Sequence, residues 1–172
     1  MSDSGQGAAY TEYIADQLAA EHARRVSLQG RAQWLLSSST TLLTLMTAVV
    51  VFLQFSGPRR IPGWLQAGYF IAVTALIVAV TAGIWAGRAY RYRVADESTL
   101  SAMLDTHWGD DQVDSRNIVA RLRVAEITSL RHGNNLMARW ALAGQLAQLV
   151  FVILFVLCAL FTVTLTDIAG TA

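Results

Sequence analysis

Arginine side chains and aromatic rings recur together in residues 88–139, the longest polar stretch of this chain. A guanidinium holds a phosphate through two parallel hydrogen bonds, and a flat ring stacks on a nucleobase. The pattern therefore indicates a nucleotide pocket, although the same arginines also fit a second interpretation, as lipid-headgroup anchors or salt-bridge partners. The candidate ligand-binding residues are Arg88, Arg91, Arg93, Trp108, Arg116 and Arg123.

Hydroxylated side chains form a second polar set, within an otherwise apolar stretch. Those on one face at helical spacing are Ser37, Thr40, Thr41, Thr44 and Thr47. Small hydroxylated residues let helices approach closely and hydrogen-bond one another, so the face fits helix packing. The alternative is a hydroxyl-lined path for water or ions. That path requires several copies, because three helices alone enclose no pore.

Motifs for catalysis or metal binding are missing. The chain has no glycine-rich phosphate loop, no cysteine pair and no H-E-x-x-H, and His22, His107 and His132 are far apart in sequence. Cys158 lies deep in an apolar stretch and is expected to be a packing residue. We therefore expect no enzyme, no catalytic residue, no metal site and no cofactor.

Three runs without a charged residue must position these side chains: residues 32–58, 61–87 and 140–166. Since about 20 apolar residues cross a bilayer as a helix, we predict transmembrane helices at 32–58, 64–87 and 140–166. No ionisable residue lies inside any span, which argues against a proton relay, ion-coupled transport or voltage sensing.

The remaining residues form the connections between the spans. We expect an N-terminal helix within residues 1–31 that runs straight into the first span. Residues 59–63, with Pro62, form an outer hairpin, and residues 167–172 form an outer tail.

Residues 88–139 are predicted to be mostly helical. The second span should continue as a helix through Leu104, followed by a loop at residues 105–111. A second helix should be capped by Asp114 or Ser115 and should kink or break at residues 132–135, which include a glycine and two asparagines.

The distribution of arginine predicts the orientation. All 13 basic residues are arginine, and eleven of them lie in residues 1–31 or 88–139. Basic residues near span ends stay in the cytoplasm. The predicted fold class is therefore all-α: three transmembrane helices, a cytoplasmic N-terminal helix and a cytoplasmic helical segment between spans two and three, with the C-terminus outside.

This order of parts resembles the PycTM family of transmembrane effectors of Pycsar bacterial antiphage systems. The resembling stretches are residues 21–25 and 30–32, the hydroxyl-rich residues 37–45, and residues 131–148 entering the third span. The resemblance implies a partner pyrimidine cyclase that senses phage and makes cyclic UMP or cyclic CMP. The effector then impairs the inner membrane, and the cell dies before phage matures.

The resemblance also implies a bacterial inner-membrane protein, and the membrane-opening hypothesis requires a homo-oligomer; no nucleic-acid partner is expected. A second hypothesis remains open. Similar three-pass chains are described as integral membrane plasmid-transfer proteins, which implies a non-enzymatic scaffold or accessory subunit of a membrane complex.

Overall fold

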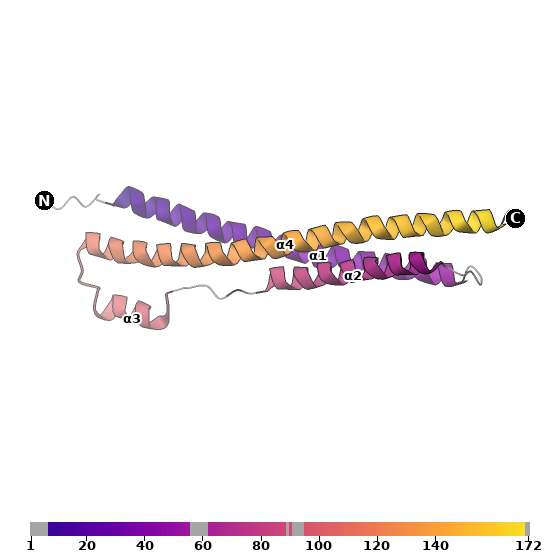
Figure 1. Ribbon diagram of the computed structural model, residues 1–172. Coiled ribbons are helices and arrows are strands. Elements are labelled where there is room, and N and C mark those ends of the chain that lie inside the picture. Colours follow the sequence, from indigo (N-terminus) through magenta and orange to yellow (C-terminus); the bar gives the residue numbers. More distant parts are fainter. Residues whose placement is uncertain (1–6, 56–61, 89, 91–94, 171–172) are drawn as a thin grey trace. The chain divides into compact units, whose positions relative to one another are not determined.

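The computed structural model describes residues 7–55, 62–88, 90 and 95–170, and its secondary structure is entirely helical over these residues. The helices are α1 (Ala8–Phe55), α2 (Gly63–Gly87), α3 (Glu97–Asp105) and α4 (Gln112–Gly170) (Figure 1). Three of them, α1, α2 and α4, are long and apolar enough to cross a membrane. The prediction of an all-helical chain with three candidate spans is thus confirmed.

The chain divides into two compact units. We call Met1–Leu28 with Ala89–Leu136 the polar unit, and Gln29–Arg88 with Met137–Ala172 the apolar unit. Helix α1 and helix α4 each contribute residues to both units, whereas α2 belongs to the apolar unit and α3 to the polar unit.

Small residues bring the three helices of the apolar unit together. Ala32 of α1, Ala86 of α2 and Ala141 of α4 form one buried layer. Nearby, a Cβ atom added to Gly144 would overlap the Leu35 side chain and lie 3.3 Å from the Ala79 carbonyl oxygen. Backbones that approach this closely are typical of helix packing inside membranes.

Further along the same bundle, packing depends on larger side chains. Phe151 of α4 is fully buried against Ala72 and Leu76 of α2. The hydroxyl groups of Tyr69 and Thr162 lie 3.1 Å apart and share a hydrogen bond between α2 and α4. Cys158 is buried as expected, close to Gly68.

In the polar unit, α3 begins at a side-chain cap. The Asp96 carboxylate accepts hydrogen bonds from the Thr99 backbone N–H at 2.9 Å and from the Ser98 hydroxyl at 3.0 Å. Hydrogen bonds from the side chain and backbone of Thr99, together with the one from Ser98, lower the pKa of Asp96. Such a cap satisfies backbone donors that the first helical turn leaves unpaired.

The predicted continuation of the second span to Leu104 is wrong. Helix α2 ends at Gly87, and Arg88 adopts an extended backbone with its N–H bonded to the Trp85 carbonyl oxygen at 3.3 Å. Glycine is a poor helix former, and this bond closes the last turn. Residues 97–105 then form the separate helix α3.

Residues 132–135 were predicted to kink or break the helix; a break is wrong, because α4 continues through them. The Asn134 side-chain amide donates hydrogen bonds to the backbone carbonyl and the carboxylate of Glu21 on α1, and the helix does not end there. The start of α4 is earlier than expected, at Gln112. The Asp111 carboxylate accepts the Gln112 N–H at 2.6 Å, in place of a cap at Asp114 or Ser115.

Candidate functional site

The predicted ligand-binding residues fall into both units. Arg88 belongs to the apolar unit, whereas Trp108, Arg116 and Arg123 belong to the polar unit. Arg91 and Arg93 lie outside the described residues.

Trp108 lies in the turn between α3 and α4 and is 80% exposed. In sequence it lies between His107 and Asp110, whose ring Nδ1 and carboxylate form a hydrogen bond of 2.7 Å. Arg116 and Arg123 follow on α4, seven residues apart, and thus lie on similar faces of this helix two turns from each other. An exposed ring can stack on a base and an arginine can bind a phosphate, but no hydrogen bond or ring contact among the described residues joins Trp108 to Arg116 or Arg123.

Arg88 lies at the end of α2 and stacks on an aromatic pair. Its guanidinium carbon is 5.0 Å from the centre of the Trp85 ring, and Trp85 stacks on Trp140 of α4 with 5.9 Å between ring centres. A cation over a tryptophan face is attracted by the electrons of the ring. The stack connects α2 to α4 at one end of the apolar unit.

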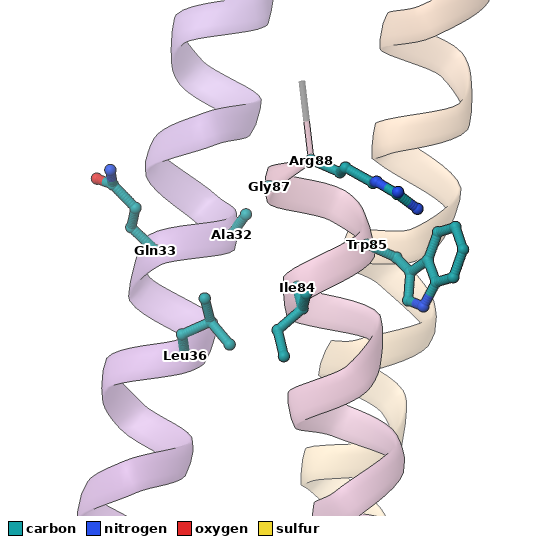
Figure 2. Close-up of a pocket in the computed structure, with 7 residues that line it drawn as sticks. All are labelled: Ala32, Gln33, Leu36, Ile84, Trp85, Gly87 and Arg88. Atoms are coloured by element: carbon teal, nitrogen blue, oxygen red, sulfur yellow. The ribbon is translucent and has the colours of Figure 1, made fainter. Parts of the chain in front are cut away.

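A groove opens between α1 and α2 beside this stack, with a volume of about 510 Å³. Figure 2 shows Leu36 and Ile84 pointing toward one another across it, while Gln33 points away and Arg88 extends over Trp85. The residues that line it are Ala32, Gln33, Leu36, Ile84, Trp85, Gly87 and Arg88. Among the described residues that line it, the groove is therefore mostly apolar, with one charged group, Arg88, at the end of α2.

The hydroxylated face of α1 is exposed in this chain. Its threonine hydroxyls donate to carbonyl oxygens four residues earlier, as in the bonds from Thr40 to Leu36 at 3.0 Å and from Thr47 to Leu43 at 2.8 Å. The members of the exposed face are the predicted residues Ser37, Thr40, Thr41, Thr44 and Thr47.

Two neighbouring serines face the other way. The Ser38 hydroxyl accepts a hydrogen bond of 2.8 Å from the Gln148 amide of α4. Ser39 is fully buried, and its hydroxyl has no hydrogen-bond partner among the described residues. Gln148 thus forms a hydrogen bond between helices within one chain, and the hydroxyl-rich segment of α1 has a buried and an exposed side.

A network in the polar unit, which the sequence did not single out as a site, joins α1 to α4. We call Glu21, Arg131 and Asn134 the clasp. Arg131 Nε donates to one Glu21 carboxylate oxygen at 2.8 Å, and the Asn134 amide donates to the other at 3.0 Å. Glu21 is only 7% exposed and Asn134 is 1% exposed.

The clasp sets the protonation of its carboxyl group. Burial, the largest influence, raises the pKa of Glu21, but the hydrogen bonds from Arg131 and Asn134 and the charges of Arg24 and Arg131 outweigh it and lower the pKa below its ordinary value. Glu21 is therefore ionised at neutral pH. The sequence feature that could have indicated the clasp is Asn134, an asparagine inside a helical segment, because a buried asparagine needs a polar partner.

No group of three or more His, Cys, Asp or Glu side chains within the described residues is placed to hold a metal ion. Comparison of the chain with protein-family models, with curated proteins and with solved structures gave no match.

Proposed function

We propose that this chain is an antiphage effector of the bacterial inner membrane. Cyclic UMP or cyclic CMP, made by a partner pyrimidine cyclase, switches it on, and the switched form impairs membrane integrity so that infection is aborted. The N-terminus and residues 88–139 lie in the cytoplasm, where this nucleotide is made, and the C-terminus lies outside.

One observation carries the proposal: α1 and α4 each pass without a break from the polar unit into the apolar unit. The clasp fixes α1 against α4 inside the polar unit. A ligand that changes this packing acts on α1 and α4, two of the three helices that cross the membrane. It must bind the active state about 10⁴-fold better to move the population from mostly off to mostly on.

The nucleotide is bound by arginine and by the exposed ring of Trp108. The flat ring supplies stacking energy for a pyrimidine, and guanidinium groups supply bidentate bonds to the cyclic phosphate. Arg116 and Arg123 are the candidates for the phosphate among the described residues of the polar unit, whereas the predicted candidate Arg88 belongs to the apolar unit. Arg91 and Arg93 are further candidates for the same role.

The output requires several copies. Spans without ionisable groups offer no relay for protons or coupled ions. An exposed hydroxylated face on α1 favours contact between copies, either as a packing surface or as the lining of an aqueous path. A homo-oligomer is therefore part of the proposal.

Dye release from liposomes tests this function. The full chain is reconstituted with trapped fluorophore, and cyclic UMP, cyclic CMP or cyclic AMP is added. We expect release with one or both pyrimidine nucleotides and none with cyclic AMP. Trp108→Ala should raise the half-maximal concentration about tenfold, because stacking on one ring contributes about 1–3 kcal/mol.

Tyr10→Ala is the matched control, since Tyr10 is another aromatic residue of the polar unit and is 78% exposed. It should leave the response unchanged. Absence of release at saturating cyclic UMP and cyclic CMP, with the chain correctly inserted, would overturn the proposal and favour the scaffold hypothesis.

A further inference from the structure

We propose that the groove between α1 and α2 is a lipid site, in which an acyl chain of an anionic glycerophospholipid lies along the apolar walls and Arg88 binds the phosphate. This site does not depend on nucleotide switching. All the described residues that line it belong to the apolar unit.

The site lies at the level where the spans carry their basic residues. Each of α1, α2 and α4 has one arginine and one tryptophan within two residues of the layer formed by Ala32, Ala86 and Ala141. All six side chains are exposed: Arg31, Trp34, Trp85, Arg88, Arg139 and Trp140. Exposed arginine and tryptophan at one level mark the boundary between lipid tails and headgroups.

Charge at this boundary has one sign. The sequence has no Asp or Glu between Glu21 and Asp96, and none between Glu126 and Asp167. A phosphate at Arg88 therefore meets no carboxylate from the neighbouring segments. This balance favours lipids with a net negative charge over zwitterionic lipids.

The geometry of Arg88 suits a phosphate. Its guanidinium carbon lies over the Trp85 ring, 5.0 Å from the ring centre, and this attraction acts through the positive charge, which leaves the N–H donors for hydrogen bonds to a phosphate. The Trp85 ring thus orients Arg88 at the end of the groove without using its donors. Figure 2 shows Arg88 extending over Trp85 and away from α1, so a headgroup at Arg88 would lie outside the space between Leu36 and Ile84.

The walls suit a hydrocarbon chain and no polar ligand. Leu36 and Ile84 face the groove, whereas the Gln33 amide points away from it (Figure 2). A volume of about 510 Å³ lies within the range of ligand pockets. A nucleotide needs several convergent polar groups, and this groove provides one.

The test is lipid binding to the purified full chain in detergent, followed by native mass spectrometry during titration with phosphatidylglycerol or phosphatidylcholine. Phosphatidylglycerol should bind at least about tenfold more tightly. Arg88→Gln should weaken phosphatidylglycerol binding about tenfold, the effect expected for one charge-assisted hydrogen-bonded contact. Arg139→Gln removes the same charge from α4, away from the groove, and should change binding less than about twofold.

The groove itself is tested by filling it. Ile84→Trp should reduce binding about tenfold, because the larger side chain occupies the space of the acyl chain. Ile77→Trp is the matched control: Ile77 is also exposed on α2, about 10 Å further along the helix.

Circular dichroism should first show unchanged helicity in all four variants. Equal binding of both lipids, equal loss in Arg88→Gln and Arg139→Gln, or unchanged binding in Ile84→Trp would each overturn the proposal. If Arg88→Gln does not fold, the comparison of Ile84→Trp with Ile77→Trp decides it.

Discussion

At the scale of single residues, the hydrogen bonds of the clasp predict a measurable contribution to stability. Glu21→Gln removes the charge that Arg131 and Asn134 satisfy, while it keeps the volume of the side chain. We expect it to lower the free energy of unfolding by about 1–3 kcal/mol, as for other hydrogen bonds to charged groups. Urea unfolding of the full chain in detergent, followed by circular dichroism, measures this change.

The difference between wild type and Glu21→Gln should depend on pH. Since the pKa of Glu21 is lowered in the folded chain, its contribution is fully present above the ordinary carboxyl pKa of about 4.3 and is lost as pH falls through the folded pKa. Glu12→Gln, at an exposed carboxyl of the same helix, is the control and should change stability by less than about 0.5 kcal/mol. A difference that stays constant down to pH 3 would contradict this account.

At the scale of helices, two glycines should respond in opposite ways to the same substitution. Gly144→Ala places a methyl group against Leu35, which is fully buried and has little room to move, so we expect the apolar unit to lose about 1–3 kcal/mol. Gly30→Ala meets no atom within 4 Å and should gain up to about 1 kcal/mol of helix propensity. Thermal unfolding in detergent compares them, and equal effects would argue against close packing at Gly144.

The helices themselves were largely predictable from sequence, because charge-free length decides which segments can cross a membrane. Three details of helix extent were not predicted: the end of α2 at Gly87, the start of α4 at Gln112 and its continuity through residues 132–135. The local preference of asparagine predicted an interruption of the helix at Asn134. Its hydrogen-bond partner Glu21 is 113 residues away in sequence, so the local pattern did not reveal this contact. The groove was not predicted either, because its lining residues come from α1 and α2 and meet only when the two helices pack. In contrast, the contact between Arg88 and Trp85 lies within one helical turn and was readable from spacing.

At the scale of the whole molecule, the exposed hydroxyls should serve assembly rather than folding. A variant with valine at all four threonines of the face keeps its helix, because each hydroxyl bonds only its own backbone. We expect it to insert normally but to lose assembly at least about tenfold, since hydrogen bonds between membrane helices average about 0.6 kcal/mol each. The substituted residues are Thr40, Thr41, Thr44 and Thr47.

Crosslinking in liposomes measures the assembled fraction. Thr74→Val with Thr81→Val on α2 is the control, because these exposed hydroxyls also bond the carbonyl four residues earlier. Unchanged crosslinking in the α1 variant would mean that copies meet through another surface.

The clasp also fixes an order of events during synthesis. Arg131 is made 110 residues after Glu21. At about 5–20 residues per second, Glu21 waits roughly 5–20 s on the ribosome for its partner. Both α1 and α2 are complete by then. The first two apolar helices can therefore enter the bilayer before α4 makes its contacts with α1 in the polar unit. The nascent chain therefore passes through a stage in which Glu21 has Arg24 of its own helix as a partner but not yet Arg131 and Asn134, and translation of α4 ends that stage.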